Sequence, residues 1–157
     1  MGTKAREIVE LDVEKLIAEL NRAYADEWLA FYQYWISARV AQGRESKVVV
    51  EELKRVALEE LEHAEELADR IIQLGGRPLT NPKEWLTKAN CAYKEPPNDP
   101  KDVARIIKDA IEAERCAISV YNKLAETTHS KDHATYHLAR HILDEELAHE
   151  DAFENML

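Results

Sequence analysis

The chain has few residues that interrupt a helix. Its 157 residues include four glycines and five prolines, and every proline lies between positions 78 and 100. From Lys101 to Leu157 there is neither a glycine nor a proline. The one run of β-branched residues, Val48–Val50, falls at an expected helix start. Strand signals are therefore absent, and four long stretches rich in Ala, Leu, Glu, Lys and Arg predict an all-α fold.

Long apolar runs are also missing. No segment approaches the roughly 20 apolar residues that a membrane-spanning helix needs, and positions 1–13 lack the apolar core of a signal peptide. Arg6 stands where a myristoylation signal would require serine or threonine. We therefore expect a soluble, cytoplasmic protein without membrane contact.

Positive charge is in short supply. The chain has 21 Lys and Arg against 31 Asp and Glu, which gives a net charge of −10. Neutralising the phosphates of a nucleic acid takes lysines and arginines, and the sequence has neither a basic tail nor a basic cluster. A nucleic-acid partner is therefore disfavoured.

Capping residues predict where the helices begin and end. The first helix should run from about Asp12, a candidate N-cap, to near Gly43. The second should begin around Ser46 and end at Gly75, because glycine suits the position that follows a helix. The fourth should begin between positions 130 and 132 and reach almost to position 157.

The third helix is expected to open with the segment Asp99–Asp102, as an N-cap, a proline at the first helical position and an acid at the third. Before it lies a connection, positions 76–98, which is long enough to let the second and third helices run parallel. Within this connection, Asn81–Glu84 predicts the start of a short helix.

An approximate internal repeat places the same polar side chains in both halves of the chain. Each half has a lone glutamate, a tyrosine one heptad later and then a Glu-x-x-His motif. The two sets are Glu27, Tyr34, Glu60 and His63, and Glu114, Tyr121, Glu146 and His149. The two glutamates of a set are 33 positions apart in the first half and 32 in the second. All these residues fall on apolar seams with spacings of three and four, so we expect them inside a four-helix bundle.

Four carboxylates in one core require compensating charge. An unpaired ionised carboxylate is too costly to bury, whereas two divalent cations balance four carboxylates with both imidazoles neutral. Glu-x-x-His places its two side chains on one face of a helix, and this ligand set is the one that four-helix bundles use to hold two metal ions. A single Glu-x-x-His motif is usually a glutamate and a histidine on a solvent-exposed helix face. The repeated motif, with a glutamate before each copy, favours a metal site.

The site also bears on domain organisation. A linker between two domains at positions 76–98 is the alternative to one bundle. It is disfavoured because each half alone has two helices and half of the metal site. We therefore expect one four-helix bundle domain over residues 1–157.

Several other residues have two interpretations. Tyr34 and Tyr121 are either ordinary core residues or donors of hydrogen bonds to the metal ligands. His133, His137 and His141 form a row beside the seam of the fourth helix, and a solvated face is favoured over a metal-entry stripe. The remaining acids are also expected on a solvated face, among them Glu62, Glu65, Glu66 and Glu145.

The two cysteines are the second informative feature. Cys116 follows Glu114 by two positions, so it should point about 200° away from the metal side. It would then face the connection that contains Cys91. A disulfide that fastens the connection beside the site and two independent buried thiols both remain possible.

The helical arrangement and ligand set resemble the ferritin-like superfamily, with a ligand pattern closest to bacterioferritin. Further segments resemble the Dps-like proteins called thioferritins. These segments are Tyr24–Trp35, Gly75-Gly76, Asn90-Cys91-Ala92-Tyr93 and Glu112–Ile118. The likeness covers nearly the whole chain, and its most specific mark is the cysteine pair beside a bacterioferritin-type centre.

The resemblance implies a function and a site. It implies a twelve-subunit cage that oxidises Fe²⁺ with hydrogen peroxide or oxygen, stores ferric mineral and protects against oxidative stress. The implied ligands of two irons are Glu27, Glu60, His63, Glu114, Glu146 and His149, and the implied disulfide is Cys91–Cys116. Manganese or zinc could occupy the same ligands.

Two departures from the relatives sharpen these expectations. Leu61 stands where bacterioferritin has its haem-ligating methionine, so haem is not expected. The sequence ends at Leu157 without the additional C-terminal helix of 24-subunit ferritins, which favours the smaller cage.

Three alternatives to a storage cage remain. The first is a di-metal peroxidase or oxidase of rubrerythrin or manganese-catalase type, although the chain lacks the Cys-x-x-Cys pair of a rubredoxin module. The second is a metal-free interaction bundle with four neutral glutamates in its core. The third, a DNA-binding shell of Dps type, is disfavoured by the charge.

Overall fold

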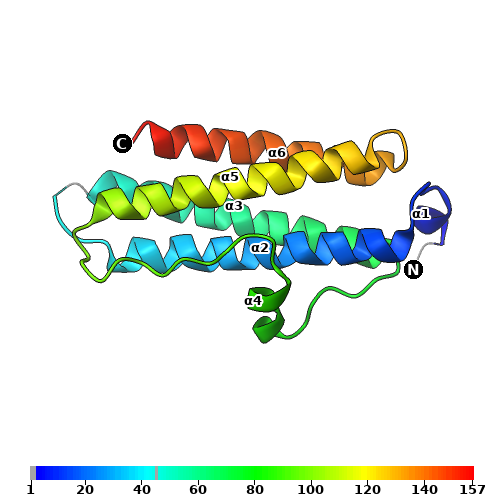
Figure 1. Ribbon diagram of the computed structural model, residues 1–157, viewed down its shortest axis with the longest axis horizontal. Helices are drawn as coiled ribbons and strands as arrows, with labels where there is room; N and C mark the ends of the chain where they lie inside the picture. Colours follow the sequence, from blue (N-terminus) through cyan, green and yellow to red (C-terminus); the bar gives the residue numbers. More distant parts are fainter. Residues whose placement is uncertain (1–2, 45) are drawn as a thin grey trace.

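The computed structural model describes residues 3–44 and 46–157, and four long helices dominate it (Figure 1). They are α2 (Val13–Val40), α3 (Ser46–Gln73), α5 (Val103–Thr128) and α6 (His133–Glu154). Three short elements accompany them: α1 (Lys4–Glu7), the 3₁₀ turn η1 (Pro82–Glu84) and α4 (Trp85–Lys88). The described residues contain no strand. The predicted all-α four-helix bundle is confirmed.

The four long helices form two hairpins. Helix α2 packs antiparallel to α3, and α5 packs antiparallel to α6 (Figure 1). The connection between the hairpins runs back along the outside of α2, so α3 and α5 are parallel, as the sequence predicts. Its short helix α4 lies against α2, where the indole of Trp85 stacks on that of Trp28 with ring centres 4.9 Å apart.

Two predicted helix ends are confirmed. The Asp12 side chain accepts hydrogen bonds from the first free amides of α2, at 3.1 and 3.2 Å. At the end of α3, Gly75 has a φ of 79°, a conformation that favours glycine. The Gly76 N–H then donates to the Ile71 carbonyl at 2.9 Å and closes the helix.

The predicted start of α5 is wrong by three residues. Asp102, rather than Asp99, is the N-cap, and it accepts a hydrogen bond from the Arg105 amide at 3.1 Å. Asp99 instead begins a turn in which its side chain accepts from the Lys101 amide. The Pro100 carbonyl of this turn accepts a hydrogen bond from the Gln42 amide at 2.8 Å, so a contact with the α2–α3 loop holds the segment outside the helix.

A buried ion pair fixes the start of α6 against α3. Asp132 caps α6, as the predicted range allows. Its two carboxylate oxygens both accept hydrogen bonds from Arg70 Nη2, at 2.9 and 2.8 Å. The Arg70 Nε donates to the Thr135 hydroxyl at 2.8 Å. These contacts satisfy an arginine that is almost fully buried.

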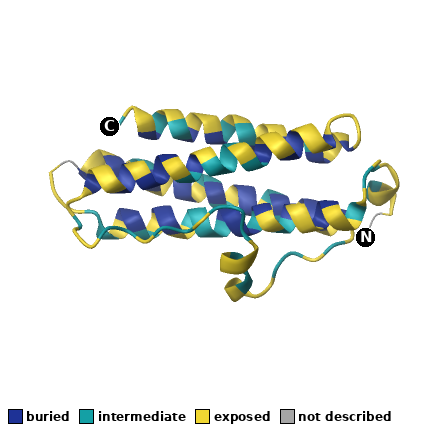
Figure 2. Ribbon diagram, viewed as in Figure 1, coloured by how far each residue is buried: buried dark blue, intermediate teal, exposed yellow. Residues whose placement is uncertain are grey.

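The apolar core has two parts, one toward each end of the bundle. One is built around Leu20, Leu67 and Ile142, and the other around Leu53 and Phe153. Buried faces of all four long helices turn toward the bundle axis (Figure 2). Between the two apolar clusters the interior is polar. None of the described helices has the length and apolar character to cross a membrane.

Candidate metal centre

Six polar side chains from all four long helices meet in the middle of the bundle. Each is at most 2% exposed. They are Glu27 from α2, Glu60 and His63 from α3, Glu114 from α5, and Glu146 and His149 from α6. The heptad-like seams explain the convergence, because each residue occupies a position at which its helix faces the core.

The six side chains form two overlapping donor groups. Glu27, Glu60, His63 and Glu146 make up the first. The second consists of Glu60, Glu114, Glu146 and His149. Within each group, one ligand atom from every residue lies within 4.8 Å of the others. Glu60 and Glu146 belong to both groups, so both carboxylates could serve two ions held side by side.

The imidazoles present the same nitrogen to the centre. His63 Nδ1 lies 3.2 Å from Glu60, 3.3 Å from Glu146 and 3.6 Å from Glu27. His149 Nδ1 lies 3.4 Å from Glu60, 3.4 Å from Glu146 and 3.8 Å from Glu114. Ligand atoms about 3–4 Å apart suit a shared ion with bonds of about 2.0–2.2 Å.

Several of these buried atoms lack a hydrogen-bond partner. They are Glu60 Oε1, both carboxylate oxygens of Glu146 and His149 Nδ1. Buried polar atoms are normally satisfied, and here the unsatisfied ones belong to the shared glutamates and an imidazole. The donor set therefore fits divalent cations.

Protons balance the charge of this cluster when no metal is bound. Burial, reinforced by repulsion from Glu60, raises the pKa of Glu27 well above its ordinary value, and burial with repulsion from Glu146 does the same for Glu114. Burial alone would lower the pKa values of His63 and His149, but the surrounding carboxylates favour the charged imidazoles and raise them. Divalent ions would have to displace these protons.

The pKa of Glu146 is shifted in the opposite direction. Burial acts to raise its pKa, but the nearby imidazoles of His149 and His63 outweigh that effect and lower the pKa to about 2. The imidazoles therefore favour the ionised form of this shared carboxylate.

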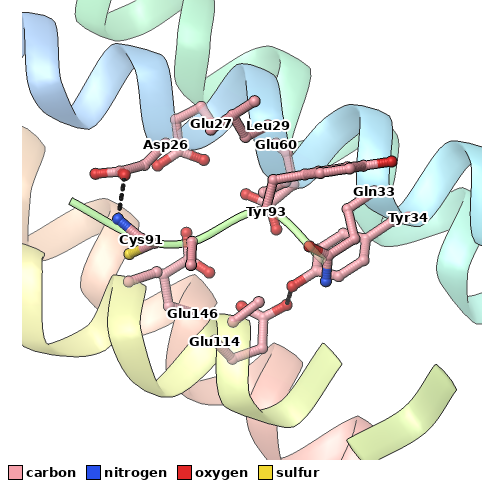
Figure 3. A pocket seen from close by; sticks show the side chains of 14 residues that line it. Asp26, Glu27, Leu29, Gln33, Tyr34, Glu60, Cys91, Tyr93, Glu114 and Glu146 are labelled. Atoms are coloured by element: carbon pink, nitrogen blue, oxygen red, sulfur yellow. Dashed lines mark hydrogen bonds between the residues drawn. The ribbon is translucent and has the colours of Figure 1, made fainter. Parts of the chain in front are cut away.

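Both core tyrosines bind a glutamate of the site, and they do so across the bundle. The Tyr34 hydroxyl, on α2, donates to Glu114 of α5 at 2.5 Å (Figure 3). The Tyr121 hydroxyl, on α5, donates to Glu27 of α2. Each tyrosine thus contacts the glutamate of the opposite half, not the one that precedes it by a heptad in the sequence.

Two further glutamates contact the imidazoles from outside. His63 Nε2 lies 2.6 Å from Glu145, and His149 Nε2 lies 2.6 Å from Glu59. The Glu145 side chain is 42% exposed, as expected of a solvated face, but its contact with His63 was not predicted. A signal was present, because both motifs read Glu-Glu-Leu-x-His and the repeat therefore includes Glu59 and Glu145.

The connection between the hairpins lies over the centre. It is joined to α5 by a disulfide between Cys91 and Cys116, whose Cα atoms are 5.8 Å apart. A pocket that reaches Glu27, Glu60, Glu114 and Glu146 is lined on its outer side by residues 91–93, which cross in front of it (Figure 3).

Two buried side chains of α2 fasten this segment, and sequence reasoning missed both. Asp26 accepts hydrogen bonds from the Asn90 side chain at 2.7 Å and the Cys91 amide at 2.8 Å. Burial raises the pKa of Asp26 to about 6. Gln33 accepts from the Lys94 amide at 2.9 Å. Partners more than 60 positions away left no pattern in the sequence that could have found them.

The histidine row of α6 lies outside the centre. His133, His137 and His141 are exposed, in agreement with a solvated face. Glu62 and Glu65 are exposed as well, whereas Glu66 is half-buried and lies 3.7 Å from His141 Nε2.

Comparison with known proteins agrees with this geometry. The model of the ferritin-like domain family matches residues 17–157. A DNA protection during starvation protein of Pyrococcus furiosus is 39% identical over 155 residues, which cover 97% of this chain and 83% of the relative. A bacterioferritin of Desulfovibrio desulfuricans is 29% identical over 143 residues, or 90% of this chain and 74% of the relative.

Solved structures give the same result. A dodecameric thioferritin, the bacterioferritin-related protein of Bacteroides fragilis, superposes with a TM-score of 0.94 at 39% identity and covers 99% of this chain and 92% of its own. Dps from Thermosynechococcus elongatus shares the fold, with a TM-score of 0.84 at 20% identity and coverage of 90% and 89%. The chain therefore belongs to the ferritin-like family, among its Dps-like and thioferritin-related members.

Proposed function

We propose that the protein is a ferroxidase and iron-storage protein. The observation that carries this proposal is the pair of donor groups that share Glu60 and Glu146, with unsatisfied buried oxygens on both shared residues. Glu27, Glu60, His63, Glu114, Glu146 and His149 are the proposed ligands of two Fe²⁺ substrate ions. Carboxylate and imidazole donors suit Fe²⁺, and they would also accept Mn²⁺ or Zn²⁺.

The reaction takes one electron from each of two Fe²⁺ ions. Two Fe²⁺, one hydrogen peroxide and two protons give two Fe³⁺ and two waters; with oxygen, the same two electrons and two protons give hydrogen peroxide. The four glutamates supply the negative charge that favours the ferric products. The imidazoles and the two carboxyls with raised pKa release protons as iron enters.

We further propose that the protein forms a cage of twelve copies that stores the ferric product. The support is the 39% identity and the TM-score of 0.94 to a dodecameric thioferritin. Consuming Fe²⁺ together with peroxide would suppress hydroxyl-radical formation, and the role that follows is protection against oxidative stress.

The test compares two double variants. Glu60→Ala with Glu146→Ala removes both shared carboxylates and should abolish rapid Fe²⁺ oxidation, followed by ferric absorbance in stopped flow. Glu62→Ala with Asp144→Ala removes one exposed acid from each of the same two helices and should leave the rate unchanged. Unchanged kinetics in the first double variant would refute the site assignment.

Storage needs a separate measurement. After excess Fe²⁺ and peroxide are added, the iron that remains with the protein is measured across a sizing column. Far more than about two irons per chain in a large assembly supports a storage cage. Two or fewer would refute storage and favour a di-metal peroxidase or oxidase.

A further inference from the structure

In each of the two imidazoles of the centre, both ring nitrogens lie close to carboxylates. His63 Nδ1 faces the shared glutamates, and its Nε2 lies 2.6 Å from Glu145 Oε2. His149 has the same arrangement, with Nε2 2.6 Å from Glu59 Oε2. Both rings are buried, whereas the Glu145 and Glu59 side chains are 42% and 32% exposed. The outer contacts therefore lie at the boundary between the core and the surface.

The direction of these hydrogen bonds follows from the chemistry of the groups. An ionised carboxylate has no proton to donate, so each Nε2–H donates to its glutamate. In a neutral imidazole only one nitrogen bears the hydrogen, and Nδ1 then presents its lone pair to the centre. A hydrogen bond on the outer nitrogen thus sets both the tautomer and the rotation of the ring.

Each outer glutamate contacts the imidazole that belongs to the other half of the repeat. Glu145 directly precedes the shared Glu146 on α6 but binds the imidazole of α3. Glu59 directly precedes the shared Glu60 on α3 but binds the imidazole of α6. One residue is a rotation of about 100° on a helix, which moves each outer glutamate off the seam and toward the neighbouring helix.

One of the outer glutamates is itself anchored. Arg55 Nη1 lies 2.6 Å from Glu59, one turn away on the same helix, and the other side of the guanidinium binds Glu52. Glu145 has a weaker neighbour in His141, whose Nε2 lies 3.9 Å away. The two acceptors are therefore alike in role but differ in their support.

We propose that Glu59 and Glu145 are positioning residues of the metal centre, each of which orients the imidazole of the opposite motif. Glu145 serves the donor group that contains His63, and Glu59 serves the group that contains His149. This inference rests on the proposed function, because it requires metal ions at the centre.

The test measures metal binding rather than iron oxidation. Metal-free protein is titrated with Co²⁺ in the presence of a competing chelator, and the visible absorption of bound Co²⁺ reports the ligand geometry. Glu145→Ala and Glu59→Ala should each weaken binding by about 10- to 100-fold. Glu145→Gln and Glu59→Gln keep an acceptor oxygen, so they should restore most of the affinity and the wild-type spectrum. Glu62→Ala and Asp144→Ala are the exposed controls.

Crystals at limiting Co²⁺ distinguish positioning from general destabilisation. Anomalous scattering gives the occupancy of each metal position separately. Glu145→Ala should lower occupancy beside His63 relative to His149, and Glu59→Ala should shift the ratio the opposite way. A uniform structural weakening would lower both together. If an alanine variant does not assemble, Glu145→Leu or Glu59→Leu replaces it, because leucine fills similar space without accepting a hydrogen bond.

The outcomes separate the two proposals. Opposite shifts in occupancy, with rescue by glutamine, support the positioning role. Alanine variants that bind Co²⁺ with wild-type affinity, or that lose occupancy equally at both metal positions, overturn the positioning role. Neither result contradicts the metal centre itself. Wild-type protein that binds no Co²⁺ overturns the metal centre itself, and the positioning role with it.

Discussion

The hydroxyls of the two core tyrosines tie the lone glutamates into the centre. Tyr34 donates to Glu114, and Tyr121 donates to Glu27, so each bond crosses from one hairpin to the other. Hydrogen bonds of this kind orient metal ligands and are costly to remove. Because the phenol rings are nearly fully buried, phenylalanine would keep the packing and remove the donor alone.

Tyr121→Phe should therefore weaken binding of Mn²⁺ by about tenfold or more. Calorimetric titration of the metal-free protein measures the change. Tyr136→Phe is the matched control, because this tyrosine packs at the edge of the core on α6. Equal affinities for wild type and Tyr121→Phe would show that the hydroxyl does not orient Glu27.

For single residues, the sequence predicts which side chains converge on the centre, but it does not predict all of their contacts. The repeat and the seams identify the six buried residues, because helical spacing determines the face on which a side chain lies. The partners of Glu59 and Glu145 are 90 and 82 positions away, on another helix. Such contacts depend on the rotation of packed helices about their axes, which a single sequence does not specify.

The connection between the hairpins is the element that depends most on tertiary contacts. Its segment at residues 90–94 is held by the disulfide, by Asp26 and by Gln33. The sequence predicts its short helix, since Asn81 caps the turn at Pro82–Glu84. Helix α1 was not predicted, because four residues are too few for a periodic pattern. The α5 start was misplaced because the Gln42–Pro100 hydrogen bond is tertiary.

Cys116→Ser should lower the free energy of unfolding by about 2–4 kcal/mol, because the disulfide closes a loop of 25 positions and restricts the unfolded chain. Guanidinium unfolding of oxidised protein measures the loss. Reductant should destabilise the wild type by a similar amount and leave the variant unaffected. The entropic account fails if oxidised wild type and variant unfold at the same denaturant concentration.

On the scale of the whole molecule, buried protons link stability to pH. The folded, metal-free protein holds protons on Glu27 and Glu114 above the ordinary carboxyl pKa of 4.5, and on His63 and His149 above 6.5. The folded state therefore binds more protons than the unfolded state as pH rises through these ordinary values. Stability is then lost with rising pH, and Asp26, with a pKa of about 6, acts in the same direction.

Metal-free protein should consequently melt at a lower temperature near pH 8 than near pH 5.5. With saturating Mn²⁺ the sign should reverse, because the bound metal requires deprotonated ligands and competes with the protons. Thermal unfolding at both pH values, with chelator or with metal, makes the comparison. The same slope with and without metal would contradict this linkage.

The charge of the molecule opposes contact with nucleic acids. One relative is named for DNA protection during starvation, but this chain has a net charge of −10 and twelve copies would multiply it. We expect no retardation of plasmid DNA in a gel at low salt, where electrostatic binding is strongest. A lysine-rich DNA-binding protein serves as the positive control. A shift that disappears as salt increases would show that DNA contacts local positive charge.

The division of the donors between the hairpins has a consequence for cleaved chains. Three donors of the first group, Glu27, Glu60 and His63, precede the connection, and its fourth donor, Glu146, follows it. In the second group only Glu60 precedes the connection. Fragments separated between positions 77 and 80 would each keep three of the four donors for one ion, and neither fragment would complete a group alone. Each divalent ion would then link the two fragments. In a chain split at this point, the fraction of fragments that associate would rise with the concentration of metal.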